Sequence, residues 1–280
     1  MADLPLVSIV TPSFNSGRYL EETLLSVQRQ DYPHIEHIVI DGGSTDGSVD
    51  IIRKHEKHLA YWVSEPDRGQ SNALNKGSAR ARGSILAHLC ADDLLAPSAV
   101  RIAVYFLSLD PTVGLVYGDR LYIDAKGNVV GIHRCPSHDP HMFRKDLTLP
   151  DEATFFRRAL FEEVGGIDED LEFSMGHDLW CKLAKITQMR HIPAFLGYFR
   201  RHDSSKSVLF DQPCGDLGAR YREEHKQAYR RHFGRGVPSP VLKKWYRFCR
   251  QMRLLLELKS KAHRHEVQMI RQIISAPLCD

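Results

Sequence analysis

Two adjacent aspartates, Asp92 and Asp93, stand at the end of an apolar run, within the segment CADDLLAP. Neighbouring carboxylates repel each other, so we expect a cation or several hydrogen-bond donors beside them. A hard divalent ion such as Mg²⁺ or Mn²⁺ prefers carboxylate oxygens and keeps coordination positions for the phosphates of a substrate. A helix beginning near Pro97 could also use the pair as a cap. The pair therefore indicates either a metal–diphosphate site or an ordinary helix start.

Acidic side chains follow other apolar runs of the first half in the same way. They stand in the loops DGGSTDG and EPDRGQ and at the end of VGLVYGD, as Asp41, Glu65, Asp67 and Asp119. Each segment alone could be a turn or a helix cap, because Asp, Gly and Pro are common there. Acidic groups that follow four separate runs in order favour a binding site over chance.

The elements that must position these carboxylates are expected to be alternating strands and helices. Short β-branched runs predict strands, and apolar residues spaced by three and four predict helices. The strands are expected over 6–11, 36–40, 60–65, 84–90 and 113–119, and the helices over 18–30, 48–58, 70–81 and 97–109. This alternation predicts an α/β fold with a mostly parallel, Rossmann-like sheet flanked by helices. Ligands of such sheets bind beyond the carboxyl ends of the strands.

The second half departs from this alternation. Two strand-like runs flank the segment KGN within 120–133, which predicts a hairpin. The segment ATFFRRALFEEVGG (153–166) is expected to be one helix that ends at its two glycines. Another helix is expected over 177–186, and strand-like segments over 190–202.

Composition limits the class of protein. The chain has 280 residues, 42% of them hydrophobic, enough for one large α/β domain with an appendage or for two small domains. No apolar run approaches the ~20 residues that a membrane-spanning helix needs, and the first residues do not resemble a signal peptide. The six cysteines form no CxxC pair, which favours reduced thiols over a zinc site or a disulfide framework. We therefore expect a cytoplasmic protein.

The charge is unevenly distributed along the chain. The net charge is +3, but the stretch from Arg220 to Arg271 alone carries +11, which leaves −8 for the rest. Within this basic stretch an apolar stripe recurs at helical spacing, formed by Leu242, Trp245, Cys249, Met252 and Leu256. Such a stripe could dock on an anionic membrane surface, pack on the catalytic body or form a homodimer seam. The basic stretch carries no nucleic-acid-binding motif, so we expect no nucleic-acid partner.

Three segments together resemble the family 2 glycosyltransferases. They are VSIVTPSFNSGRYLEETLLSVQRQDYPHIEHIVIDGGSTDGS, SEPDRGQSNALNKG and LCADDLLAP, and the resemblance extends over residues 5–205. It implies the GT-A fold, a nucleotide-diphosphate sugar as donor, inversion at the transferred sugar, and Mn²⁺ or Mg²⁺ as cofactor. The chain has neither a GxxxxGK[ST] loop nor a GxGxxG motif, which argues against the usual ATPases and dehydrogenases.

The resemblance also implies roles for individual residues. The nucleotide sugar would contact Thr11, Pro12, Ser13, Asn15, Asp41, Asp67, Gly69, Gln70, Lys76 and Asp92. Asp41 would accept a hydrogen bond from the base, which suits the N–H of uracil and favours a UDP-sugar. Ala91, Asp92 and Asp93 match the DXD-type motif, although its first position is Ala here. Asp93 would be a metal ligand, and His202 in YFRRHDSSKS would be another.

The catalytic base is implied to lie in GHDLWCKLAK, where the family commonly carries an acidic pair. Asp178 matches the base, whereas His177 departs from the pattern, so Asp170 and Glu172 remain alternatives. Without a catalytic role, Asp178 would be the N-cap of its helix. The base would take the proton of the acceptor hydroxyl in a single displacement, while the metal stabilises the leaving diphosphate.

The expected organisation follows from these assignments. Residues 1–212 would form the catalytic domain, with a nucleotide-sugar half over 1–119 and an acceptor half over 120–212, and residues 213–280 a basic helical C-terminal extension. Acceptor contacts are expected near Asp151 and Glu152. The acceptor would be a glycan or a lipid-linked molecule in polysaccharide or glycolipid assembly, which favours peripheral contact with the inner face of the membrane. A nucleotidyltransferase and a non-catalytic sugar-nucleotide-binding module are the alternatives.

Overall fold

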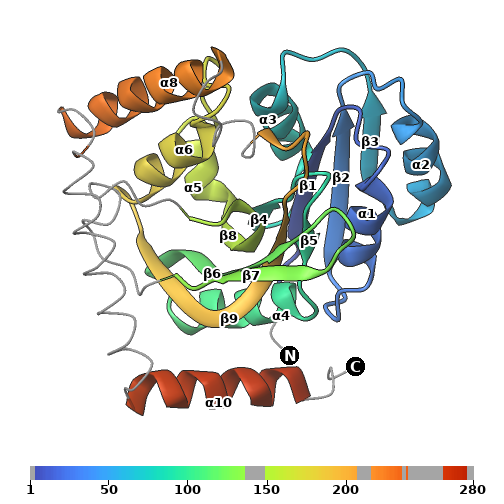
Figure 1. Ribbon diagram of the computed structural model, residues 1–280. Helices are drawn as coiled ribbons and strands as arrows, with labels where there is room; N and C mark the ends of the chain where they lie inside the picture. Colours follow the sequence, from blue (N-terminus) through green and yellow to red (C-terminus); the bar gives the residue numbers. More distant parts are fainter. Residues whose placement is uncertain (1–3, 136–148, 207–215, 235–237, 239–260, 276–280) are drawn as a thin grey trace.

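The computed structural model describes residues 4–135, 149–206, 216–234, 238 and 261–275. A curled sheet runs through the centre, with helices on both of its faces (Figure 1). The strands are β1 (Val7–Ser13), β2 (Ile35–Asp41), β3 (Tyr61–Ser64), β4 (Ile85–His88), β5 (Leu94–Leu95), β6 (Val113–Ile123), β7 (Val129–His133), β8 (Thr154–Arg157) and β9 (Gln188–Arg200). The helices are α1 (Leu20–Gln28), α2 (Ser48–His55), α3 (Gln70–Arg80), α4 (Ala99–Leu109), α5 (Arg158–Glu163), α6 (Met175–Leu183), α8 (Asp216–Phe233) and α10 (Lys261–Ser275), with short 3-10 turns η1 (Glu56–His58) and η3 (Asp151–Ala153).

The strands of the described residues lie in the order β3-β2-β1-β4-β8-β6-β9-β5, and β7 pairs with β6 at the side. The first half has the predicted parallel arrangement, because β1 pairs in parallel with both β2 and β4, and β2 with β3. The chain order reverses on either side of β1, which makes the carboxyl ends of β1 and β4 the expected place for a ligand. The predicted hairpin over 120–133 is present as β6 and β7.

Adjacent residues of the central strands serve two different cores. Ile9 of β1 packs in a cluster with α4 residues such as Phe106, whereas the next residue, Val10, packs with α6 residues such as Trp180. This follows from the period of two in a strand, whose successive side chains point to opposite faces. Because both faces are covered, the strands are continuous apolar runs rather than alternating ones.

The prediction of one helix over 153–166 is wrong. Thr154–Arg157 forms β8, an antiparallel strand inserted between β4 and β6, and only Arg158–Glu163 is helical. Phe155 and Phe156 are fully buried in the two different cores, which only a strand allows for neighbouring residues. The insertion makes the sheet mixed rather than purely parallel.

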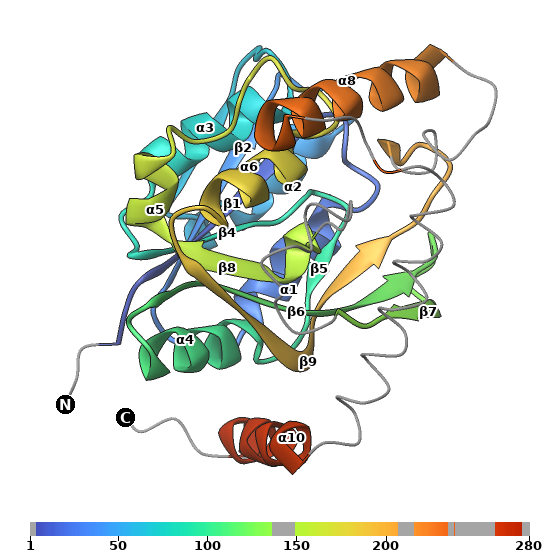
Figure 2. The same ribbon diagram turned by 90° about the vertical axis from the view of Figure 1, so that its left-hand side faces the viewer.

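Two helices of the C-terminal region pack on the α/β body. Both views place α8 beside α6 and α10 beside α4 (Figure 1, Figure 2), and contacts join both pairs. Arg190 of β9 forms an ion pair with Glu266 of α10 at 3.0 Å, and Tyr105 of α4 donates to the sulfur of Met269 at 3.3 Å. The apolar stripe that begins at Leu242 lies outside the described residues. Among the helices that are described, none combines the length and the apolar character needed to cross a membrane.

Candidate active site

A cavity of about 730 Å³ opens at the carboxyl ends of β1 and β4. Its size lies within the range of about 300–1,000 Å³ that is usual for small-molecule sites. The structure brings nine of the predicted site residues to its wall: Pro12, Ser13, Asn15, Asp67, Gly69, Gln70, Asp92, Asp93 and His202. The sequence motifs therefore converge on one cavity, although 190 positions separate the first from the last.

The loop after β1 forms one wall and is fixed by the loop after β2. Asn15 has a left-handed backbone with a φ of 49°, which Asn tolerates better than most residues. Its backbone N–H donates to Ser44 Oγ at 2.8 Å, and its side-chain oxygen accepts from the N–H of Thr45 at 3.0 Å. These two hydrogen bonds hold the wall formed by Pro12 and Ser13 in place.

Asp41 lies behind this wall rather than in it. Its side chain is fully buried and accepts hydrogen bonds from the hydroxyls of Ser13, Ser44 and Ser64 at 3.0, 2.6 and 2.7 Å. The backbone N–H groups of Gly43 and Ser44 add two further bonds. In this structure Asp41 fixes the loops that follow β1, β2 and β3, and a contact with a base would replace one of these bonds.

Two other predicted residues do not reach the cavity. Thr11 is fully buried, and its hydroxyl is paired with His37 Nε2 at 2.9 Å. Lys76 forms an ion pair at 2.9 Å with Glu65, whose side chain is half exposed. Thr11 therefore lies in the interior of the sheet, and Lys76 lies on α3 with its side chain paired at the surface.

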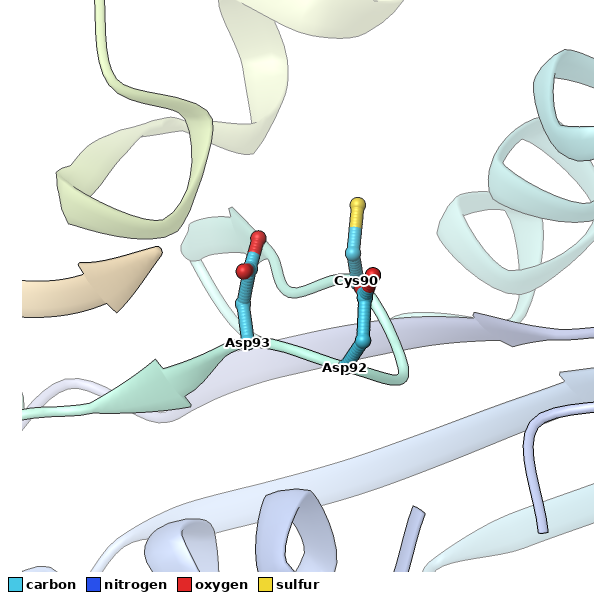
Figure 3. Close-up of side chains that lie close together, drawn as sticks. All are labelled: Cys90, Asp92 and Asp93. Atoms are coloured by element: carbon cyan, nitrogen blue, oxygen red, sulfur yellow. The ribbon is translucent and has the colours of Figure 1, made fainter. Parts of the chain in front are cut away.

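Cys90, Asp92 and Asp93 form a cluster of potential metal ligands. Their side chains point to the same side of the loop between β4 and β5 (Figure 3), and their ligand atoms all lie within 4.8 Å of one another. Burial, and then the charge of Asp92, raises the pKa of Asp93 well above its usual range. Burial and the same carboxylates raise the pKa of the Cys90 thiol. Two carboxylate oxygens that repel each other in a buried place fit a divalent cation such as Mn²⁺ or Mg²⁺.

Arg200, at the end of β9, forms hydrogen bonds to the loop that carries Asp92 and Asp93. Its guanidinium is fully buried, donates to the carbonyl oxygen of Asp92 at 2.9 Å and forms an ion pair with Glu22 at 2.6 Å. The backbone N–H of Arg200 donates to Asp93 Oδ1 at 2.8 Å. Because the guanidinium is satisfied by Glu22 and a carbonyl, it shapes the loop without neutralising the carboxylate pair.

His202 reaches the cluster through Asp92. Its Nε2 lies 3.0 Å from Asp92 Oδ2, and its Nδ1 lies 2.9 Å from Ser204 Oγ. The imidazole also packs against the ring of Tyr19, with 4.6 Å between the centroids. Both nitrogens therefore have partners here, and one of these contacts must open before His202 can coordinate an ion.

The structure places Asp178, the predicted catalytic base, outside the lining of the cavity. Asp178 is fully buried on α6, does not line the cavity, and forms ion pairs with His232 of α8 at 2.6 Å and with Lys182 at 2.9 Å. Burial would raise its pKa, but the hydrogen bonds from His232 and Lys182 outweigh burial and lower the pKa to about 2. A carboxylate held so strongly in its charged form is a weak base.

Asp151 lies at the cavity wall, where the sequence indicated only acceptor contacts. It accepts a hydrogen bond at 2.9 Å from Trp180 Nε1 of α6. Desolvation by the surrounding protein raises the pKa of Asp151, while the charge of Arg120 acts in the opposite direction. Arg120 itself is held by Glu152 in a two-point ion pair, at 2.8 and 2.9 Å.

The wall opposite the nucleotide loops is held by α8, a feature that the sequence reasoning missed. Glu224 accepts hydrogen bonds from the backbone N–H groups of Glu172, Phe173 and Ser174 at 2.9, 2.7 and 2.6 Å. Glu172 and Phe173 line the cavity. The basic residues of α8 also pair with this acidic segment, since Arg220 contacts Glu172. Part of the basic C-terminal region therefore completes the cavity.

Comparison with known proteins identifies the family. The family model described as "Glycosyl transferase family 2" matches residues 8–165. An uncharacterized glycosyltransferase of Mycobacterium tuberculosis is 36% identical over 79% of this chain and 87% of its own length. The chondroitin synthase of Escherichia coli is 26% identical over 68% of this chain, which spans only 28% of that enzyme.

Solved structures share the fold. S. aureus TarS 1–349, solved in complex with UDP-GlcNAc, has a TM-score of 0.67 at 15% identity and covers 96% of this chain and 81% of its own. The mannosyltransferase PcManGT of Pyrobaculum calidifontis, solved with GDP-Man and Mn²⁺, has a TM-score of 0.58 at 20% identity and covers 98% and 86%. The predicted fold class, an α/β fold of GT-A type with C-terminal helices, is confirmed. From the family match over more than half of its length, together with its mycobacterial relative, this chain belongs to glycosyl transferase family 2.

Proposed function

We propose that this glycosyltransferase transfers a sugar, with inversion, from a UDP-sugar to an acceptor hydroxyl in polysaccharide or glycolipid assembly. The cluster of Asp92, Asp93 and Cys90 in the wall of a cavity at the carboxyl ends of β1 and β4 carries this proposal. The position is where sheets of this type bind nucleotides, and the donor set suits a divalent ion that neutralises a diphosphate.

The nucleotide would lie against the loops that follow β1, β2 and β3. Pro12, Ser13 and Asn15 form this wall, and Asp67 stands at its edge, where it accepts a hydrogen bond from the N–H of Gly69 at 2.7 Å. Asp41 would exchange one of its serine partners for the N–H of uracil. TarS, which shares the fold, was solved with UDP and with UDP-GlcNAc, and PcManGT was solved with GDP-Man, so the preference for uracil rests on Asp41.

The metal would be held by Asp93 and Asp92, with Cys90 and His202 beside them. Oxygen ligands dominate this set, so Mn²⁺ or Mg²⁺ fits better than a softer ion. When bound, the ion offsets the charge that builds up on the leaving diphosphate. Lys206, which lines the cavity and lies 3.5 Å from Gln70 Oε1, is a further cation on the same side.

Inversion requires a single displacement with one base. The residues that bind the donor orient its sugar toward the wall formed by Asp151, Glu172 and Phe173, which leaves this wall for the acceptor. A side chain there takes the proton of the acceptor hydroxyl as the new bond forms. The relatives that build polysaccharides, such as the chondroitin synthase, support a glycan or lipid-linked glycan as acceptor.

Two other readings make different predictions. A non-catalytic module would bind UDP-sugars without turning them over, and a nucleotidyltransferase would act on a nucleoside triphosphate and a sugar phosphate. We would incubate the full chain with UDP-glucose, UDP-galactose and UDP-GlcNAc, with and without Mn²⁺, and measure UDP release. Mn²⁺-dependent release supports the proposal. Binding without release, or pyrophosphate release from UTP and a sugar 1-phosphate, would replace it with one of the other readings.

A further inference from the structure

Five carboxylates line the cavity in the described part of the chain, and four of them already have other tasks. They are Asp67, Asp92, Asp93, Asp151 and Glu172. Asp92 and Asp93 belong to the metal cluster, and Asp67 holds the nucleotide loop through Gly69. Glu172 is nearly half exposed and is paired with Arg220. Asp151 lines the wall with an accessible side chain, has Trp180 as its hydrogen-bond partner, and forms no ion pair with a cation among the described residues.

We propose that Asp151 is the general base that removes the proton from the acceptor hydroxyl. The proposal rests on the proposed function and replaces Asp178 in the catalytic step. The hydroxyl proton passes to Asp151 Oδ2, and the hydroxyl oxygen forms the new bond to the anomeric carbon. The bond from that carbon to the diphosphate oxygen breaks, and its electron pair leaves with the nucleoside diphosphate.

The topology of the sheet places Asp151 beside the metal loop. Asp151 begins η3, directly before β8, and β8 runs antiparallel to β4 with Ala87 opposite Phe155. The segment that precedes β8 therefore lies at the end of the sheet where β4 runs into the loop with Asp92 and Asp93. A base must stand close to the reacting carbon, and this position meets that condition.

Two residues of α6 shape the place that the Asp151 carboxylate occupies. A Cβ at Gly176 would lie 2.9 Å from Asp151 Oδ1, so no larger residue fits there without moving the carboxylate. Trp180 stands one helical turn later on the same face and donates to this Oδ1 at 2.9 Å. One oxygen is thus oriented by Trp180, which leaves Oδ2 for a proton, as in catalytic groups held by a third residue.

Electrostatics are consistent with this role. Desolvation by the surrounding protein raises the pKa of Asp151, which strengthens its carboxylate as a base, while the charge of Arg120 favours the ionised form. Asp178 differs from Asp151, because hydrogen bonds from His232 and Lys182 lower its pKa to about 2. Of Asp151 and Asp178, Asp151 is the one that lines the cavity and whose pKa is raised.

The test compares Asp151→Asn with Asp178→Asn and with Asp50→Asn, a change at an exposed residue of α2. The readout is UDP release in Mn²⁺ from UDP-glucose, UDP-galactose and UDP-GlcNAc, with water as the hydroxyl, together with the affinity for UDP by calorimetry. We expect Asp151→Asn to lower kcat by about 10²–10⁴-fold, the usual contribution of a general base, with an unchanged Kd for UDP. Asp50→Asn should match the wild type, and Asp178→Asn should lose less than about tenfold per folded molecule.

Gly176→Ala provides an independent variant if Asp151→Asn does not fold. The added methyl group must displace the Asp151 carboxylate, so kcat should fall while the affinity for UDP is kept. The proposal is overturned if both folded variants retain the wild-type kcat, or if the loss occurs in Asp178→Asn alone. It is also overturned if Asp151→Asn abolishes UDP binding, because that assigns Asp151 to the donor. A wild-type chain that releases no UDP from any donor contradicts the proposed function itself, and Asp151 as its base with it.

Discussion

Glu224 Oε1 accepts the backbone N–H of Ser174 at 2.6 Å, across fifty positions of the sequence. The same carboxylate also accepts the N–H groups of the two residues before Ser174, so one side chain of α8 fixes three consecutive residues of the cavity wall. A helix from the C-terminal region thus supports the wall of the cavity from behind.

Glu224→Gln should loosen this wall. The amide offers one accepting oxygen in place of two and carries no charge, and hydrogen bonds to charged groups contribute about 1.5–3 kcal/mol. We expect faster amide hydrogen exchange at residues 172–174 and a lower rate of UDP release. Glu223→Gln is the matched control, because Glu223 is exposed and pairs only with Lys226 among the described residues. Equal exchange rates in both variants would contradict the role of Glu224.

Asp93→Asn should remove the metal site without unfolding the chain. The amide cannot supply the negative charge that a divalent ion requires, while its side-chain oxygen can still accept the N–H of Arg200. We expect Mn²⁺ binding, followed by electron paramagnetic resonance, to weaken by at least about tenfold, and UDP release to be lost. Asp110→Asn, in an exposed turn, should change neither. Normal Mn²⁺ affinity in Asp93→Asn would assign the metal to other residues.

Asp178→Asn should reduce stability more than catalysis. Removing one partner of a buried ion pair costs about 3–5 kcal/mol, because Lys182 loses its counter-charge and His232 loses the oxygen with which it is paired. Since the pKa of Asp178 is lowered to about 2 in the folded state, this contribution is complete above the unfolded value near 3.8. It is lost as the pH falls from there through 2. Urea unfolding measures the loss, with Asp170→Asn on the surface as control, and a free energy of unfolding within error of the wild type would refute it.

His37 should make the folded state sensitive to mild acid. Burial lowers its pKa to about 3, so below pH 6.5 the unfolded chain binds a proton that the folded chain does not. Stability from this residue is complete above pH 6.5 and falls by about 1.4 kcal/mol per pH unit as the pH decreases toward 3. Urea unfolding at pH 7.5 and 5.5 should show a smaller difference for His37→Gln than for the wild type. The exposed His58→Gln should leave the difference unchanged, and an equal effect of both changes would contradict this account.

The first half of the fold could be predicted because its signals are local. Each strand of the β1 to β4 region is a short β-branched run, and each is followed by a helix with its own apolar spacing. β8 could not be predicted in this way, since Phe155 and Phe156 belong to a compact apolar segment whose period is unreadable over four residues. Their assignment to two cores depends on β4 and β6 on either side, which is tertiary information.

The residues of the site also fall into those that local motifs predict and those that depend on tertiary contacts. Motifs on consecutive strand ends converge because parallel strands end at one edge of the sheet, so Pro12, Asp67 and Asp92 meet as expected. Asp178 lies in a helix, as the sequence predicts. Its side chain pairs with His232 of α8, and no local sequence pattern predicts that contact. The role of Glu224 could not be predicted, because Glu224 lies among basic residues of a helix that is distant in the sequence. Its three backbone N–H partners come close to it only in the folded chain.

The reaction proposed for this site is a Mn²⁺-dependent transfer, with inversion, of a sugar from a UDP-sugar. The most direct measurement follows the reaction of the full chain with an α-linked UDP-sugar and Mn²⁺ by ¹H NMR, before the released sugar equilibrates between anomers. We predict that the β-anomer of the released or transferred sugar forms first and that Asp93→Asn forms none. Initial formation of the α-anomer would contradict inversion, and a rate that is the same with Mn²⁺ and with excess chelator would contradict the metal site at Asp93.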